Sequence, residues 1–217
     1  MIRGMDVRLK ICGMREHRNI VEVGQRRPDY MGFILYKGSP RYVGEEFVVP
    51  DALPRSVRKV GVFVNASTDE MLDQALRHSL TAVQLHGNES PEQCLAIRDK
   101  GYQVIKAFPV DNAFDFGVTI AYESCVDFFM FDAKGIYHGG NARPFDWIAL
   151  RQYNQSVPFF LSGGLSPENV AGIRSLLDMN LHALDVNSGI EDAPGLKSLA
   201  RLAAFENALE KMNDLSL

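Results

Sequence analysis

The chain has 217 residues, of which 46% are hydrophobic, 23% charged and 10% aromatic. This composition is typical of a globular protein and excludes intrinsic disorder, a collagen-like chain and a coiled coil. The 23 Lys and Arg residues against 27 Asp and Glu give a formal net charge of -4, which repels a polyphosphate backbone, so we expect no nucleic-acid partner. The length fits one large domain, and we expect residues 1–217 to form it.

The N-terminal segment and the cysteines bear on location and redox chemistry. Residues 1–10 mix charged with apolar side chains, and nowhere is there an apolar run long enough to span a bilayer. We therefore expect a cytoplasmic protein with no membrane partner. The three cysteines, Cys12, Cys94 and Cys125, are odd in number and far apart, which fits neither a disulfide framework nor a zinc site.

Eight short apolar runs, many of them β-branched, predict strands along the chain. The runs are residues 7–12, 30–35, 59–64, 82–86, 103–108, 128–132, 159–162 and 182–187. Their starts are spaced by about 20 to 30 residues, the room that a strand, a helix and two loops require in a barrel. Such near-continuous apolar strands suit a parallel sheet covered on both faces. We therefore expect an α/β fold, a single (β/α)8 TIM barrel with eight parallel strands and outer helices.

Helix signals lie between these runs. Residues 90–93, Ser-Pro-Glu-Gln, predict a helix start with a capping box, and residues 166–169, Ser-Pro-Glu-Asn, predict a second one. Ser67 or Thr68 is expected to open an earlier helix, and residues 196–212 predict a closing helix. Because residues 44–54 contain two prolines, the second crossover is expected to be short or irregular.

Glycines follow the seventh and eighth predicted strands. In a barrel of this kind the active site is built at the C-terminal ends of the strands, and a phosphate commonly binds in the loops after the last two. Gly163 and Gly164 follow the seventh run, and Ser188 and Gly189 follow the eighth. Glycines let backbone N–H groups approach phosphate oxygens, although a plain turn uses the same residues. We expect these four residues to bind the phosphate of a small phosphate monoester.

Three groups at strand ends are candidates for proton transfer. Cys12 lies at the expected barrel mouth, where N–H dipoles and a cation would lower its pKa from ~8.5 toward neutrality and make it a general base. The alternative is a small buried hydrophobic residue. Asp132 ends an apolar strand, where partial desolvation disfavours the charged form and suits a general acid, the alternative being a loop cap or a salt bridge to Lys134. Asp185 is a second candidate carboxyl, or else it orients its loop.

Two basic residues complete the candidate site. Arg41, in the loop after the second run, can form a bidentate pair with a substrate carboxylate, the alternative being an exposed loop arginine. His86 has no second histidine or acidic residue at metal spacing, so we interpret it as a structural histidine, or one that supports a site residue, and not as a metal ligand. We expect no metal site elsewhere.

Seven motifs are spread over nearly the whole chain. They are Lys10-Ile11-Cys12-Gly13-Met14, Gly32-Phe33-Ile34-Leu35 with Ser39-Pro40-Arg41-Tyr42, Val60-Gly61-Val62-Phe63-Val64-Asn65, Gln84-Leu85-His86-Gly87, Phe145-Asp146-Trp147, Leu161-Ser162-Gly163-Gly164-Leu165 and Asp185-Val186-Asn187-Ser188-Gly189-Ile190-Glu191. Together they closely resemble the phosphoribosylanthranilate isomerase family of tryptophan biosynthesis. The cysteine after the first strand and the Gln-Leu-His-Gly tetrad are specific to that family among phosphate-binding barrels.

The resemblance implies an Amadori rearrangement of N-(5-phosphoribosyl)anthranilate to 1-(2-carboxyphenylamino)-1-deoxyribulose 5-phosphate, an aldose–ketose isomerisation without a cofactor. A general acid protonates the ribose ring oxygen, the ring opens to a Schiff base, and a general base removes the C2 proton to give an enolamine. By position the acid is Asp132 and the base Cys12, while Arg41 receives the anthranilate carboxylate. We assign Asp185 to the substrate-binding residues, and we expect a monomer or homodimer.

The chain departs from the family in two loops. The family usually has Gly-Gly-Thr-Gly in the sixth loop, where residues 139–142 here read Gly-Gly-Asn-Ala, so we expect this loop to close differently. Asn187 stands where a serine is common.

Two other functions share this pattern. A Schiff-base aldolase would use Lys106 at the end of the fifth run, and an epimerase would share the fold and phosphate site. A sugar-phosphate binding protein without turnover would be expected to lack Cys12 or Asp132, and both are present. A single phosphate site argues against the two-phosphate ribonucleotide of histidine biosynthesis.

Overall fold

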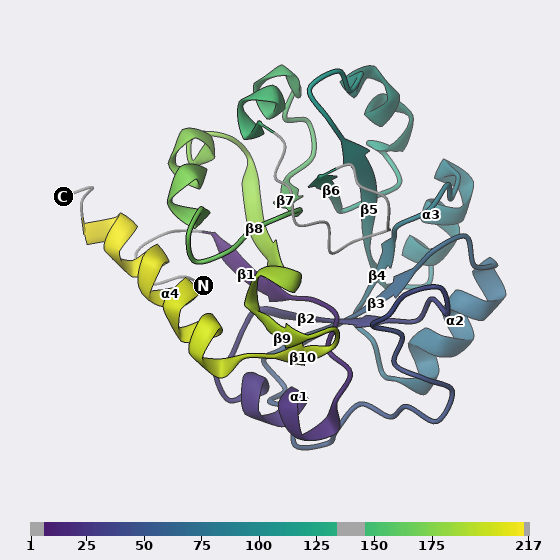
Figure 1. Cartoon of the computed structure of the whole chain (residues 1–217). Helices are drawn as coiled ribbons and strands as arrows, with labels where there is room; N and C mark the ends of the chain where they lie inside the picture. The colour runs from purple at the N-terminus through teal and green to yellow at the C-terminus, as the bar shows by residue number, and fades with distance from the viewer. Residues whose placement is uncertain (1–6, 134–145, 215–217) are drawn as a thin grey trace.

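Eight parallel strands form a closed barrel in the computed structural model, which describes residues 7–133 and 146–214 (Figure 1). The strands are β1 Arg8–Ile11, β2 Tyr30–Ile34, β3 Arg58–Phe63, β4 Ala82–Leu85, β5 Gln103–Val110, β6 Phe128–Ala133, β7 Phe159–Leu161 and β8 Leu181–Val186. Each predicted strand is present, and β1 pairs with β8 to close the barrel. The predicted (β/α)8 TIM barrel of the α/β class is confirmed.

Helices cover the outside of the barrel (Figure 1). The α-helices are α1 His17–Gly24, α2 Thr68–Arg77, α3 Pro91–Arg98 and α4 Leu199–Asp214. The described residues also form shorter 3-10 helices, which are η1 Phe116–Tyr122, η2 Trp147–Gln152, η3 Val170–Leu176 and η4 Ser188–Ile190. Between β2 and β3 the described segment 35–57 consists of turns and loops, which agrees with the irregular crossover predicted there.

The predicted helix starts are confirmed at α2 and α3. Ser67 Oγ accepts from the Glu70 N–H at 3.2 Å. Ser90 Oγ accepts from the Gln93 N–H at 3.4 Å, while Gln93 Oε1 accepts from the Ser90 N–H at 3.1 Å, so the capping box is complete. Each cap satisfies N–H groups that a helix leaves without partners in its first turn.

Two predicted helix boundaries are wrong. At residues 166–169 one half of the box is present, since Asn169 Oδ1 accepts from the Ser166 N–H at 2.9 Å, but Ser166 Oγ accepts from the Glu168 N–H, and the helix begins at Val170 in the 3-10 form. Such side chains compete for nearby N–H groups and favour turns over helix. The closing helix begins at Leu199, because the short strand β10 Leu196–Lys197 pairs with β9 Glu191–Ala193 in a separate two-stranded sheet.

The strands alternate between the two sides of the barrel wall. Along β6, Phe128 and Met130 belong to the apolar cluster inside the barrel, and Phe129 and Phe131 belong to the larger cluster under the helices. Because side chains alternate along a strand, Asp132 continues the inward row. This alternation decides which polar side chains reach the barrel interior.

Two further observations concern the described part of the chain. None of the helices in residues 7–133 and 146–214 has both the length and the hydropathy needed to cross a bilayer. The sixth loop at residues 139–142, which we expect to close differently, lies outside the described residues.

Candidate active site

Polar side chains take over the inward row at the C-terminal ends of the strands. On β1 and β8 the outward residues Ile11 and Leu184 pack under the helices, which leaves Lys10 and Asp185 on the inward side. Cys12 follows Lys10 by two residues and packs with Ile34 and Val62, which lie on β2 and β3. The residues that follow the apolar barrel core therefore form the floor of a polar site.

A pocket of about 530 Å³, counting the open space at its mouth, lies over this floor. Its lining includes six of the predicted site residues, Cys12, Gly163, Gly164, Asp185, Ser188 and Gly189. Asp132 and Arg41 do not line it but contact residues beside it, as described below. The structure thus brings together side chains from both ends of the sequence.

Cys12 is buried at the bottom of this pocket, with 4% of its surface exposed. Burial raises the pKa of its thiol, and the ammonium groups of Lys10 and Lys197 oppose that rise without cancelling it. The expected lowering of the Cys12 pKa toward neutrality is therefore wrong for the protein alone. A sequence does not show how completely water is excluded, and that exclusion sets the direction here.

A buried ion pair joins β1 to β8 beside the thiol. Lys10 Nζ donates to Asp185 Oδ1 at 2.8 Å, and Ser162 Oγ donates to Asp185 Oδ2 at 3.2 Å. Burial alone would lower the pKa of Lys10, but Asp185 and Cys12 hold it above its ordinary value. Burial raises the pKa of Asp185, against the opposing effect of Lys10. Asp185 thus orients Lys10, a role that sequence reasoning did not consider.

Asp132 is held by a chain of polar contacts from β4. Its Oδ2 lies 3.2 Å from His86 Nε2, and His86 Nδ1 lies 2.7 Å from Gln84 Nε2. With the Gln84 amide nitrogen donating to Nδ1, His86 carries its proton on Nε2 and donates to Asp132. The other oxygen, Oδ1, is buried and has no hydrogen-bond partner among the described residues. His86 therefore orients the carboxyl, and Lys134, the alternative partner, lies outside the described residues.

Arg41 is buried and paired. Its Nε lies 3.0 Å from both carboxylate oxygens of Glu191, and Nη2 lies 2.6 Å from Oε2. Lys197 Nζ donates to Glu191 Oε1 at 2.6 Å, and burial lowers the pKa of Lys197 to about 8. Burial would raise the pKa of Glu191, but Arg41 and Lys197 together hold it below its ordinary value. Sequence reasoning missed Glu191 and Lys197 as functional residues, although Glu191 stood within a quoted motif.

The two glycine turns meet at the other side of the pocket. Gly163 and Gly164 have φ values of 91° and 72°, a left-handed backbone that favours glycine, and their N–H groups donate to no described residue. A Cβ on Gly189 would lie 1.9 Å from the Leu165 carbonyl oxygen, so only glycine lets the second turn pack against the first. Unpaired N–H groups in adjacent glycine turns form an anion-binding concavity.

Among residues 7–133 and 146–214, no three His, Cys, Asp or Glu side chains are grouped as metal ligands. The chemistry that the described residues offer is proton transfer by a thiol and a carboxyl, next to backbone donors for an anion and an arginine for a carboxylate.

Comparisons with known proteins agree with this chemistry. The profile of the family described as N-(5'-phosphoribosyl)anthranilate (PRA) isomerase matches residues 9–208. An N-(5'-phosphoribosyl)anthranilate isomerase of Parabacteroides distasonis is 44% identical over 200 residues, with 91% of this chain and 90% of the relative covered.

Solved structures show similarity to the same family. The phosphoribosyl anthranilate isomerase of Thermotoga maritima superimposes with a TM-score of 0.81 at 34% identity, with 94% of this chain and 99% of that one covered. A second structure, of a phosphoribosyl anthranilate isomerase in complex with reduced 1-(o-carboxyphenylamino)-1-deoxyribulose 5-phosphate, has a TM-score of 0.77 at 33% identity, with 94% and 99% covered. The chain therefore belongs to the N-(5'-phosphoribosyl)anthranilate isomerase family.

Proposed function

We propose that the protein converts N-(5-phosphoribosyl)anthranilate to 1-(2-carboxyphenylamino)-1-deoxyribulose 5-phosphate, with Cys12 as general base and Asp132 as general acid. The observation that supports these roles is that Cys12 and Asp132 both belong to the row of side chains that point into the barrel at the C-terminal ends of the strands. This row places a thiol on the pocket floor, and it places the carboxyl of Asp132 on the inward side of β6, in contact with His86, which lines the same pocket. Proton transfer requires an acid and a base that are positioned, and the inward row positions both of these side chains.

Substrate binding is proposed to begin at the phosphate. The N–H groups of Gly163, Gly164 and Gly189, with the Ser188 side chain, are positioned to receive the phosphate oxygens. The chain has a formal net charge of -4, so local backbone dipoles are needed to hold an anion there. Asp185 lines the same pocket and is proposed to contact the sugar.

The proposed reaction moves protons in balance. Asp132, protonated at Oδ1, gives its proton to the ribose ring oxygen as the C1–oxygen bond breaks, and the nitrogen lone pair forms the C1=N double bond. The Cys12 thiolate takes the C2 proton, the electrons of the C–H bond form the C1=C2 bond of the enolamine, and the π electrons of the C1=N bond return to nitrogen. Asp132 then regains a proton from the C2 hydroxyl as the carbonyl forms, and C1 is protonated by the Cys12 thiol. Substrate and product have the same atoms, and no oxidant or reductant is required.

Arg41 is proposed to bind the anthranilate carboxylate through the part of its guanidinium that Glu191 leaves open. Glu191 occupies Nε and Nη2, while Nη1 makes no hydrogen bond to the described residues. The pair with Glu191 fixes the guanidinium plane, which a two-pronged interaction with a second carboxylate requires.

A related structure supports the substrate class. The solved relative with reduced 1-(o-carboxyphenylamino)-1-deoxyribulose 5-phosphate bound holds an open-chain form of the product on the same fold. We carry that ligand class to this chain as part of the proposal. The site residues come from one chain, so the account fits either the predicted monomer or the predicted homodimer; the cytoplasmic location and the single domain over residues 1–217 also stay predictions.

The alternative of a Schiff-base aldolase is disfavoured by the environment of Lys106. Its Nζ donates to Leu85 O, Gly87 O and Glu89 Oε2 at 3.2, 2.7 and 3.0 Å. Lys106 does not line the pocket, and its nitrogen is enclosed by these three oxygens, away from the place where a substrate carbonyl would have to lie.

The test is loss of phosphoribosylanthranilate fluorescence with purified protein, with the substrate made in situ. We expect turnover that is proportional to protein concentration. In a parallel arm, borohydride is added with substrate, and the protein mass is expected to stay unchanged because the Schiff base forms within the substrate. A borohydride-stable adduct on Lys106 together with absent turnover would overturn the proposal.

A further inference from the structure

Three buried lysines near the top of the barrel differ in how fully their ammonium groups are satisfied. Lys106 donates to three oxygens, and Lys197 donates to Asn187 O, Asn187 Oδ1 and Glu191 Oε1. Lys10 is fully buried and donates to one oxygen, Asp185 Oδ1. Because an ammonium group has three hydrogens, Lys10 has donor capacity left in the protein interior.

The sulfur of Cys12 lies next to the ammonium group of Lys10. A Cβ placed on Gly32 of β2 would lie 2.7 Å from Cys12 Sγ and 3.2 Å from Lys10 Nζ, so both atoms border the same point. Gly32 therefore leaves room for the thiol and the ammonium to lie side by side, and any larger residue would fill that space. Both residues lie on the inward side of β1 and its extension, two positions apart.

We propose that Lys10 is a positioning residue for the reaction, whose ammonium stabilises the Cys12 thiolate that removes the C2 proton. Asp185 holds Lys10 in place and at the same time weakens its effect, because its carboxylate repels the thiolate. The inference rests on the proposed role of Cys12 as the base. Lys10 itself is not proposed to touch the substrate.

Other charged groups around Cys12 act in the same field. Lys197 on β10 also favours the thiolate, and it is paired with Glu191 on β9, which also binds Arg41 from the loop after β2. With all five groups ionised, the three cations exceed the two carboxylates, Asp185 and Glu191, by one charge. A thiolate at Cys12 would neutralise that excess, and this attraction opposes the effect of burial without cancelling it.

The test measures the thiolate directly and needs no turnover. The full-length protein is alkylated with iodoacetamide between pH ~7 and ~11, and the rate is taken from the mass of the Cys12 peptide, since the thiolate is the reacting form. We expect Lys10→Met to move the midpoint upward by about one pH unit, which is a ~10-fold slower reaction at a fixed pH below both midpoints. Lys10→Arg should recover part of the loss because it keeps the charge.

Two further variants separate charge from structural damage. Asp185→Asn should move the Cys12 midpoint downward, because it removes a nearby negative charge. Lys106→Met removes an equally buried lysine on the outer side of the wall and should leave the midpoint unchanged. Loosening of the fold would expose Cys12 and speed alkylation in both Lys10→Met and Asp185→Asn. Shifts in the same direction for these two, or an unshifted Lys10→Met, would overturn the inference.

A destabilised Lys10→Met does not end the test. The double variant Lys10→Met with Asp185→Asn leaves no unpaired carboxylate, and its Cys12 midpoint is expected above that of Asp185→Asn alone. Equal midpoints would contradict the role of Lys10. The isomerase assay on Cys12→Ser tests the proposed function separately, because undiminished turnover there removes Cys12 as the base without changing the alkylation result.

Discussion

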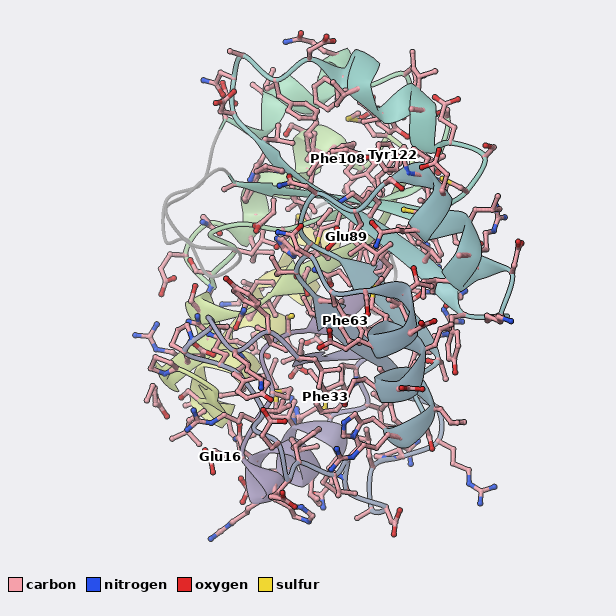
Figure 2. The ribbon with its side chains drawn as sticks, turned by 90° about the vertical axis from the view of Figure 1, so that its right-hand side faces the viewer. Glu16, Phe33, Phe63, Glu89, Phe108 and Tyr122 are labelled. Atoms are coloured by element: carbon pink, nitrogen blue, oxygen red, sulfur yellow. The ribbon has the colours of Figure 1, made fainter. Side chains whose placement is uncertain are left out.

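Lys10 and Lys106 are both buried, and each is paired to a buried carboxylate, yet they lie on opposite sides of the barrel wall. Lys10 and Asp185 belong to the inward row under the pocket. Lys106 lies between the outward residues Val104 and Phe108 and meets Glu89 in the loop after β4. Figure 2 shows Glu89 on this outer side, between Phe63 and the pair Phe108 and Tyr122.

The difference shows how one type of ion pair serves two purposes. Glu89 also accepts from the N–H groups of Asn65 and Gly87, so the Lys106–Glu89 pair ties together the loops after β3 and β4 and has no donor left over. The Lys106–Glu89 pair, in which every ammonium hydrogen is used, stabilises the loops. The Lys10–Asp185 pair leaves ammonium hydrogens that can act on the Cys12 sulfur.

The largest effect is expected on the inner side, at Asp132. Asp132→Asn keeps the shape but has no acidic proton to give, so kcat should fall by ~10²–10⁴-fold. The variant should still fold, because the asparagine side chain has nearly the same shape as aspartate and fits among the same neighbouring residues. The check is the isomerase assay with a thermal melt, and Asp178→Asn, which changes an exposed carboxylate paired with Arg151, is the control. An equal loss of kcat in Asp132→Asn and Asp178→Asn would show that the loss does not depend on the position of Asp132 inside the barrel.

On the outer side, Lys106→Met should reduce stability rather than chemistry. It leaves the Glu89 carboxylate buried without its cation, and breaking a buried pair costs about 3–5 kcal/mol. Denaturant unfolding measures the loss, while kcat under folding conditions should match the parent. The double variant Lys106→Met with Glu89→Gln should recover part of the stability. If Lys106→Met lowered kcat and left the free energy of unfolding unchanged, the claim that Lys106 serves stability and not catalysis would be wrong.

A smaller effect is expected at Arg41. Arg41→Lys replaces a planar fork by a point charge, so kcat/KM should fall by an amount equivalent to about 1–3 kcal/mol. The anthranilate end is bound away from the reacting atoms, so we expect KM to rise and kcat to change little. Parental kinetics would mean that the carboxylate binds elsewhere.

The smallest effect concerns the acid stability of the outer pair. Burial would raise the pKa of Glu89, but Lys106 and the Asn65 N–H hold it below its ordinary value. Its stabilising contribution is therefore present above the unfolded pKa of ~4.3 and is lost as pH falls through the folded value. Melting temperatures taken from neutral to acidic pH should fall less steeply in Glu89→Gln than in the parent. Parallel curves would show that Glu89 does not titrate with folding.

Particular residues show how far sequence carries this account. The apolar runs and the spacing of their starts predicted the barrel, and the position of Cys12 and the glycines predicted the pocket. The alternation of side chains along a strand, applied to Lys106 between Val104 and Phe108, would have placed it outside and disfavoured an aldolase. The Arg41–Glu191–Lys197 cluster depends on β9 and β10, strands of three and two residues that have no periodicity to detect. The pKa of Cys12 depends on burial, which arises only on folding.

The most direct measurement compares turnover of phosphoribosylanthranilate by the parent, Cys12→Ser and Lys106→Met at one pH, followed as loss of substrate fluorescence. We expect the parent and Lys106→Met to share one kcat and Cys12→Ser to lose ~100-fold or more, because a hydroxyl is a far poorer base than a thiol. No turnover by the parent, or equal turnover by Cys12→Ser, would contradict the account.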